Sequence, residues 1–176
     1  GPIMPRMSTQ IAILMGSDSD FDQVRGALPV LEELGLTHEE RVLSAHRTPR
    51  ELQEYVENSP AKIFIAAAGG AAHLAVVIAS MTTRPVLGIP IGGTSLNGLD
   101  SLLSTVQMPG GIPVATFAVG KAGAKNAAIF AAQILATSDE ALAEKLRTQR
   151  AGMAKKVLEK DRALQDKCRL QPERHG

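Results

Sequence analysis

The chain has 176 residues, 44% of them hydrophobic, which is enough for one globular domain with a full-sized core. Its 19 basic and 18 acidic residues leave a formal net charge of +1, and only 3% of the residues are aromatic. These values argue against a nucleic-acid surface, and no apolar run approaches the roughly 20 residues that a membrane span needs.

Short apolar runs alternate with helical patterns along the chain, which is typical of β-α-β units and a parallel sheet. Residues 10–15 predict the first strand, 21–34 a helix and 37–43 the second strand. Pro29 lies inside the first helix, where a proline removes a hydrogen bond and clashes with the preceding turn. We therefore expect this helix to kink or to restart near the proline.

The second helix has the clearest start signal in the chain. Thr48 can cap it, Pro49 suits its first position, and Glu51 completes a capping box. The remaining elements, in chain order, are a strand over 62–67, a helix over 72–81, a strand over 85–89, a helix over 99–106, a strand over 114–119 and an Ala-rich helix over about 122–136.

From Ser138 the sequence becomes charged, and we expect a helix that runs to about Lys167. Its apolar residues are spaced for one face of a helix. They are Leu142, Leu146, Met153, Val157 and Leu158. Two interpretations fit this pattern: a solvated helix that lies on its own domain, or an arm that packs on a neighbouring subunit.

Right-handed crossovers between these strands predict an α/β fold, a three-layer αβα sandwich with a five-stranded parallel sheet and a C-terminal helical arm. We expect a single domain over residues 8–167 and disordered ends over 1–7 and 168–176. Gly1-Pro2 ahead of two methionines resembles a scar of tag cleavage. The first residues lack the apolar stretch of a signal peptide, so we expect a cytoplasmic protein.

In such folds ligands bind beyond the carboxyl ends of the strands, so the loops there form the candidate site. The first loop reads Gly16-Ser17-Asp18-Ser19-Asp20. A glycine, hydroxyl donors and a helix N-terminus favour an anion such as phosphate. The alternative is that these residues only cap the helix. Two aspartates oppose an anion, so at least one of them should face sugar hydroxyls or solvent.

The second loop runs from Ser44 to Pro49 and holds a histidine next to an arginine. Arg47 offers a planar fork of donors that matches phosphate oxygens. His46 stands at a strand-to-helix junction and is of the residue type that most often moves protons near neutral pH. The alternative for this pair is an ordinary surface histidine and arginine.

The third loop combines two glycines with a histidine. Gly69 and Gly70 carry no side chain, so the backbone can approach a flat ligand and offer amide donors. His73 stands at the start of the next helix, where we expect a structural cap or a core hydrogen bond rather than ligand contact.

The sequence lacks the motifs of several other enzyme classes. It has no glycine-flanked serine of a hydrolase and no Gly-Lys-Ser or Gly-Lys-Thr of a Walker loop. Cys168 is the only cysteine, which excludes an intrachain disulfide and a cysteine metal cluster. The four histidines lack metal-ligand spacing, so we expect no metal.

Taken together, four runs resemble the class I PurE family, whose members are 5-(carboxyamino)imidazole ribonucleotide mutases of purine biosynthesis. The runs are GSDSD at 16–20, SAHRTP at 44–49, AGGAAHL at 68–74, and DSLLS at 100–104 continuing to QMP at 107–109. The resemblance covers roughly residues 11–136 in order, and the SAHRTP run is its most specific part.

The resemblance implies a flavodoxin-like fold and a homo-octamer in which neighbouring subunits complete each site. It implies that Ser17, Asp20 and Arg47 bind the ribonucleotide substrate. It assigns proton transfer to His46 and implies no cofactor. The further candidates in the matching motifs are Ser19, Ser44, Gly69, Gly70 and Ala71, with His73 as a secondary candidate.

The implied reaction moves a carboxyl group from an exocyclic nitrogen to a ring carbon through carbon dioxide. His46 would protonate the carbamate nitrogen, which releases carbon dioxide, and would later remove the proton from the carbon that recaptures it. Carbon dioxide must not escape between these steps, so a closed, dry pocket is required.

Two stretches depart from the family's usual pattern. Ala75-Val76 stand where members have Pro-Gly, and residues 91–95 differ after the fourth strand. Both bear on pocket shape and rate more than on reaction class. Three other hypotheses remain: a carboxylase that joins carbon dioxide directly to aminoimidazole ribonucleotide, a non-catalytic module that binds flavin or a phospho-ligand, and a low-activity paralogue.

Overall fold

The computed structural model describes residues 3–170, so the tag remnant expected at Gly1-Pro2 lies outside the described residues. Five strands form one parallel sheet. They are β1 (Ile11–Met15), β2 (His38–Val42), β3 (Ile63–Gly69), β4 (Val86–Ile91) and β5 (Ala115–Thr116). Their order across the sheet is β2-β1-β3-β4-β5, which confirms the predicted five-stranded parallel sheet.

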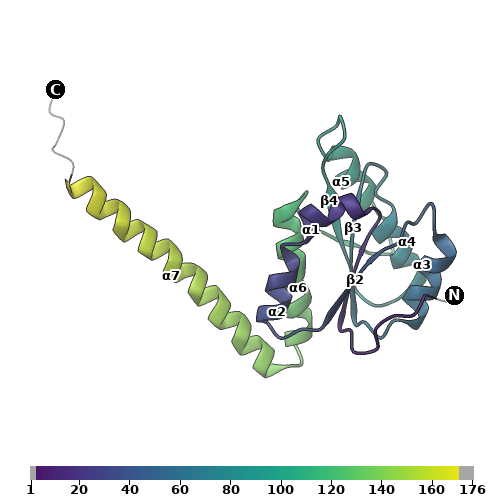
Figure 1. Ribbon diagram of the computed structural model, residues 1–176, viewed down its shortest axis with the longest axis horizontal. Helices are drawn as coiled ribbons and strands as arrows, with labels where there is room; N and C mark the ends of the chain where they lie inside the picture. Colours follow the sequence, from purple (N-terminus) through teal and green to yellow (C-terminus); the bar gives the residue numbers. More distant parts are fainter. Residues whose placement is uncertain (1–2, 171–176) are drawn as a thin grey trace. The chain divides into compact units, whose positions relative to one another are not determined.

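Helices cover both faces of this sheet (Figure 1). The helical elements of the chain are a short 3-10 turn η1 (Asp18–Asp20), α1 (Phe21–Val24), α2 (Ala27–Glu33), α3 (Pro49–Asn58), α4 (Leu74–Met81), α5 (Leu99–Val106), α6 (Lys121–Ala136) and α7 (Glu140–Leu170). Figure 1 shows α1, α2 and α6 on one side of the strands and α3 and α4 on the other. The predicted three-layer α/β sandwich is therefore confirmed.

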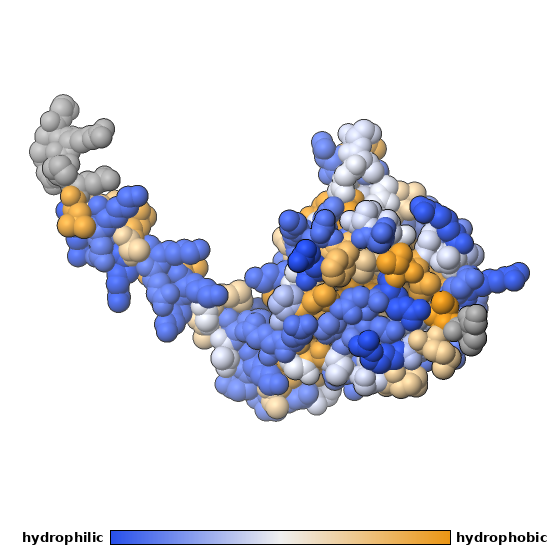
Figure 2. Space-filling model, in the orientation of Figure 1, coloured by the Kyte–Doolittle hydropathy of each residue, from blue (hydrophilic) through white to orange (hydrophobic). Residues whose placement is uncertain are grey.

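The chain groups into two compact units, residues 1–134 and 135–176. The second unit consists largely of α7, a helix of 31 residues whose surface is mostly hydrophilic (Figure 2). None of the described helices combines the length and the apolar character that crossing a membrane requires. The single domain over residues 8–167 stays a prediction.

Helix α7 extends further than the sequence predicted. It continues from the expected end near Lys167 through Leu170, so the first residues of the expected disordered tail are helical. No proline interrupts the sequence up to that point, and Lys167 and Arg169 place positive charge at the helix C-terminus, where it is favourable. The rest of that tail, residues 171–176, lies outside the described residues.

The central strands are buried on both sides, as a parallel sheet between two helical layers requires. All five residues of β1 and all six of β4 are buried. Tyr55 of α3 and Phe64 of β3 are the largest fully buried side chains, and both belong to the cluster that joins α3 and α4 to the sheet.

The first helical region is interrupted, as Pro29 predicts. The helix expected over 21–34 is divided into α1 and α2, and the break falls at Arg25-Gly26. Pro29 is the third residue of α2, in the first turn, where a backbone N–H has no acceptor within the helix. The proline therefore costs α2 no hydrogen bond.

The last strand is shorter than predicted, because only Ala115–Thr116 pair regularly with β4. Beyond this pair, the Phe117 N–H donates to the Gly88 carbonyl (3.0 Å) and the Gly120 N–H to the Pro90 carbonyl (2.9 Å). The two donors, Phe117 and Gly120, are three residues apart, whereas their acceptors, Gly88 and Pro90, are two residues apart. The extra residue is a bulge, which ends the ladder early.

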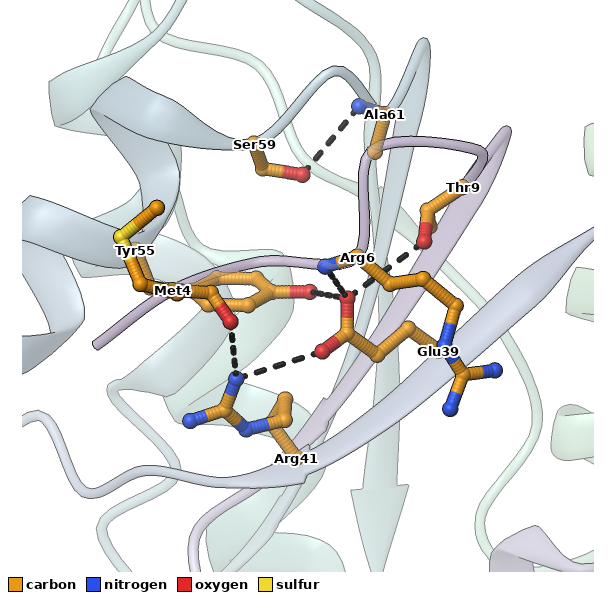
Figure 3. A network of polar contacts seen from close by, with 8 residues as sticks. All are labelled: Met4, Arg6, Thr9, Glu39, Arg41, Tyr55, Ser59 and Ala61. Atoms are coloured by element: carbon orange, nitrogen blue, oxygen red, sulfur yellow. Dashed lines mark hydrogen bonds and ion pairs between the residues drawn. The ribbon is translucent and has the colours of Figure 1, made fainter.

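Residues 3–7 are ordered, although we expected disorder over residues 1–7. Pro5 is buried, and the Met4 carbonyl accepts a hydrogen bond from the Arg41 guanidinium at 3.3 Å. The segment is anchored on Glu39, a buried carboxylate on the edge strand β2 (Figure 3).

Four donors surround Glu39 in Figure 3. They are the Arg6 N–H (2.7 Å), the Tyr55 hydroxyl (3.1 Å), the Arg41 guanidinium (3.2 Å) and, at a longer 3.4 Å, the Thr9 hydroxyl. Burial by itself would raise the pKa of Glu39, but the hydrogen bonds and the charge of Arg41 lower it on balance. Burial and the neighbouring carboxylate raise the pKa of Tyr55, so its hydroxyl keeps the proton that it donates.

We expect Glu39→Gln to lower the free energy of unfolding at neutral pH by about 1–3 kcal/mol, the cost of disrupting a buried hydrogen-bonded group. Because folding lowers the pKa of Glu39 from 4.5, its contribution is complete above that pH and is lost as the pH falls through the folded-state pKa. The gap between wild type and variant should therefore narrow on acidification in urea titrations.

Glu33→Gln provides the matched control, because Glu33 is exposed. A gap for Glu39→Gln that stays constant from neutral pH to well below 4.5 would show that the carboxylate charge is not what stabilises the network.

Candidate active site

Three loops at the carboxyl edge of the sheet surround a pocket of about 200 Å³. Its lining residues are Gly16, Ser17 and Asp20 after β1, Ser44, Ala45, His46 and Arg47 after β2, and Ala68, Gly69, Ala71, His73 and Leu74 from the end of β3 to the start of α4. Every candidate named from the sequence lines this pocket except Ser19 and Gly70. Whether the lining residues bind or catalyse stays a prediction.

In the first loop two hydroxyl groups contact each other. The Ser19 N–H donates to the Ser17 hydroxyl at 3.3 Å, and the two hydroxyl oxygens lie 2.9 Å apart. Ser17 thereby caps the turn η1 and also lines the pocket. Ser19 supports Ser17 without lining the pocket itself.

The two aspartates of this loop differ in burial. Asp18 is exposed, whereas Asp20 is only 9% exposed and lines the pocket. Burial raises the pKa of the Asp20 carboxyl, a backbone hydrogen bond with Ser17 opposes the rise, and the nearby Asp18 carboxylate adds to it. Asp18 is therefore the aspartate that faces solvent, and Asp20 is the one that a ligand would meet.

The second loop is a turn closed between Ser44 and Thr48. The Thr48 N–H donates to the Ser44 carbonyl (3.0 Å), and the Thr48 hydroxyl accepts from the Ser44 N–H (2.8 Å) and donates to the same carbonyl (3.0 Å). The predicted capping box with Glu51 is wrong, because the Thr48 hydroxyl is engaged in this turn and makes no cap bond. Pro49 does begin α3, as predicted.

Two exposed side chains project from this turn and line the pocket, those of His46 and Arg47. The Arg47 N–H donates to the Ser44 hydroxyl at 3.1 Å, which fixes the backbone beneath the side chain. Within residues 3–170 no carboxylate forms an ion pair with the Arg47 guanidinium. The guanidinium is therefore available to an anionic ligand.

His46 and His73 are hydrogen-bonded to each other across the pocket. His46 Nε2 lies 2.8 Å from His73 Nδ1, and the rings meet edge to face with centroids 4.9 Å apart. One of these two nitrogens must donate and the other accept, so a single proton lies between them. The cap role expected for His73 is wrong, because its side chain makes no cap bond to α4.

The third loop turns at Gly70, whose φ of 61° is rarely adopted by residues with a side chain. The loop then closes with a bond of 2.8 Å from the His73 N–H to the Ala71 carbonyl. Gly69 and Ala71 leave room beside the pocket for a flat ligand because neither carries a bulky side chain.

Proton transfer and anion binding are the chemistry that this pocket can support. It holds two imidazoles, a carboxyl group with a raised pKa and a guanidinium that has no ion-pair partner among the described residues. Among the described residues, no three side chains of His, Cys, Asp or Glu come together as a metal ion would require.

Comparisons with known proteins match the whole of this region. The profile of the AIR carboxylase family matches residues 10–156. The N5-carboxyaminoimidazole ribonucleotide mutase of Bacillus subtilis is 51% identical over 156 residues, which cover 87% of this chain and 96% of that protein. The protein of the same name from Brucella melitensis is 49% identical over 157 residues, which cover 88% and 97%. The crystal structure of Treponema denticola PurE superposes with a TM-score of 0.78 at 27% identity and covers 88% of this chain and 97% of that one.

We expect Thr48→Val to speed amide hydrogen exchange at Ser44, because valine keeps the shape of threonine but cannot accept the Ser44 N–H. Losing one such bond should reduce protection roughly twofold to tenfold. Thr48→Ser, which keeps the hydroxyl, is the control and should retain protection. Unchanged exchange at Ser44 in the valine variant, measured by NMR, would mean that the hydroxyl does not hold the turn.

Proposed function

The chain belongs to the AIR carboxylase family, and we propose that it is an N5-carboxyaminoimidazole ribonucleotide mutase of purine biosynthesis. The observation that carries this proposal is that His46 and Arg47, neighbours in sequence, both open onto the pocket. One can move a proton and the other can bind a phosphate, the two tasks that such a mutase must combine. A cytoplasmic location, expected from the sequence, belongs to the same proposal.

In the proposed complex, Arg47 binds the phosphate of the ribonucleotide with its planar fork of donors. Asp20 accepts hydrogen bonds from ribose hydroxyls, and the hydroxyl of Ser17 contributes beside it. The base lies against the backbone of Gly69 and Ala71, where no bulky side chain blocks a flat ring.

The remaining candidates support the residues that make these contacts. The hydroxyl of Ser44 holds the backbone under Arg47, and Ser19 holds Ser17. Gly70 supplies the bend of the third loop. Their substitution should affect binding through the residues that they support.

His46 carries both proton transfers of the proposed reaction. In its protonated form it gives a proton to the carbamate nitrogen, whose bond to the carboxyl carbon breaks to give carbon dioxide and the neutral amine. The ring carbon of the aminoimidazole then attacks carbon dioxide, and neutral His46 removes the proton from that carbon. The proton that His46 gives up in the first step is replaced by the one that it removes in the second, so the proposed reaction needs no cofactor.

His73 holds the ring of His46 in the orientation that both steps require. The hydrogen bond of 2.8 Å between the rings restrains the rotation of His46, and it leaves His46 Nδ1 as the free ring nitrogen. Within this mechanism, Nδ1 is the atom that exchanges protons with the substrate.

The comparisons favour the mutase over the alternatives left open by the sequence. The relatives that are 51% and 49% identical carry the name of the mutase and match this chain over nearly their whole length. The departures at Ala75-Val76 and at residues 91–95 leave His46 and Arg47 unchanged.

The test is the conversion of N5-carboxyaminoimidazole ribonucleotide by the purified chain, followed in the ultraviolet. Conversion without added nucleotide or flavin supports the mutase. Product formed only from aminoimidazole ribonucleotide and carbon dioxide would indicate the direct carboxylase. A yellow protein that binds flavin and converts neither compound would indicate the non-catalytic module.

We expect His46→Asn to lower turnover by at least the 10²–10⁴-fold that is typical of a lost general acid–base residue. Asparagine cannot gain or lose a proton at neutral pH, but binding should survive because Arg47, Asp20 and Ser17 are unchanged. His73→Asn is the comparison variant, and its turnover should fall less. The reverse ranking in well-folded variants would move the proton-transfer role to His73.

The same proposal includes a homo-octamer. It is supported by apolar side chains that are exposed to solvent in both compact units of the chain. Leu99 and Leu103 of α5 are 54% and 48% exposed, and Leu158 of α7 is 68% exposed. Burying such residues between subunits is favourable. In analytical ultracentrifugation the full chain should sediment at eight times the 18.6 kDa of one chain, and a monomer would contradict the proposal.

A further inference from the structure

Helix α5 presents hydroxyl groups to the interior of the protein and leucines to its surface. Ser101 and Thr105 are buried, whereas Leu99 and Leu103 are about half exposed. A helix on a globular domain normally shows the opposite pattern, with its apolar face inward. The inward hydroxyls must therefore serve polar partners, and these lie at the end of β4 and in the third loop of the pocket.

The closest contact between α5 and that loop is made by Ser104. Its hydroxyl accepts the Ala72 N–H at 3.0 Å and can donate to the Asp100 carbonyl at 2.8 Å within the helix. The Thr105 hydroxyl lies 3.4 Å from the carbonyl of Ala72, so both peptide groups of this residue face α5. Ala72 is 2% exposed, so removal of the serine hydroxyl would leave a buried N–H without its acceptor, which is costly.

Ala72 directly precedes His73 in the chain. The loop bends at Gly70, so the backbone between that bend and α4 is short, and the Ser104 hydroxyl fixes it near its middle. The place of His73 Nδ1, and hence its distance of 2.8 Å from His46 Nε2, follows from where this backbone is held.

Helix α5 is itself fixed to the sheet, as a helix that supports a loop must be. The Ser101 hydroxyl donates to the Ile91 carbonyl at the end of β4 (2.7 Å). Gly88 of β4 admits the helix, because a Cβ at this position would lie 2.6 Å from the Thr105 methyl group. These contacts anchor α5 to the sheet without touching the pocket.

We propose that Ser104 is a positioning residue of the active site, which sets the His46–His73 pair by holding the backbone N–H of Ala72. Ser104 is not among the residues that line the pocket, so it acts through the backbone that carries His73. The proposal rests on the function proposed above for its effect on turnover, but its effect on the histidine pair can be measured without substrate.

The test compares Ser104→Ala with Ser101→Ala, two variants that each remove one hydroxyl from the same face of α5. Ser104→Ala should lower kcat roughly tenfold to hundredfold with little change in KM, the scale expected when reacting groups are misplaced by about 1 Å. Ser101→Ala should lose thermal stability but keep kcat. Ser104→Thr keeps the hydroxyl and should restore most of the turnover.

The second readout is the ¹⁵N NMR spectrum of the two imidazole rings, which reports whether His46 Nε2 and His73 Nδ1 still share a proton. We expect Ser104→Ala to change these shifts and Ser101→Ala to leave them. If Ser104→Ala does not fold, Ser104→Cys, with a weak acceptor of similar size, takes its place with the same expectation.

The proposal is overturned if the Ser104 variant matches Ser101→Ala in both kcat and ¹⁵N shifts, or if a folded Ser104→Thr fails to recover. A wild-type chain that converts no substrate contradicts the proposed function instead. The ¹⁵N comparison then still decides whether Ser104 positions the histidine pair.

Discussion

The site depends first on the order of the strands. β1 lies between β2 and β3, and the helices that follow β1 cover the opposite face from those that follow its two neighbours (Figure 1). At such a switch point the chain departs to both faces and leaves a crevice above the strand ends. The loops after β2 and β3 therefore face each other across the end of β1, and His46 reaches His73 over 27 residues of sequence. Gly16, at the end of β1, adds no side chain to the space between them.

Each half of the histidine pair is held by a hydroxyl group that does not line the pocket. Thr48 closes the turn under His46, and Ser104 holds the backbone before His73. Both hydroxyls bond to backbone groups, whose positions are less free than those of side chains. The distance between the two imidazole rings is thus set by contacts outside the pocket lining. These contacts come from the start of α3 on one side and from α5 on the other. The reaction proposed for this site, with two proton transfers by one residue, requires this kind of support.

The sequence predicted those features that follow from local chemistry. Continuous apolar runs indicated buried parallel strands, and Pro29 marked the break between α1 and α2. The sequence did not predict features in which a polar group can bond to any of several partners. The hydroxyl of Thr48 can cap a helix or close a turn, and only the fold decides between the two. In the same way, no pattern of spacing indicated that Glu39 would anchor the N-terminal segment or that His73 would turn toward the pocket.

Helix α5 connects the surface of the protein with the loop that carries His73. Its leucines are exposed on one side, and on the other side Ser104 holds the loop that carries His73. In the proposed octamer, burial of these leucines between subunits would remove apolar surface from water, which favours association. The same contact restrains the helix on which the loop rests. The proposed assembly and the proposed catalysis would then depend on the same helix. A helix held between a neighbouring subunit and the sheet restrains the histidine pair more closely than a helix that is open to solvent.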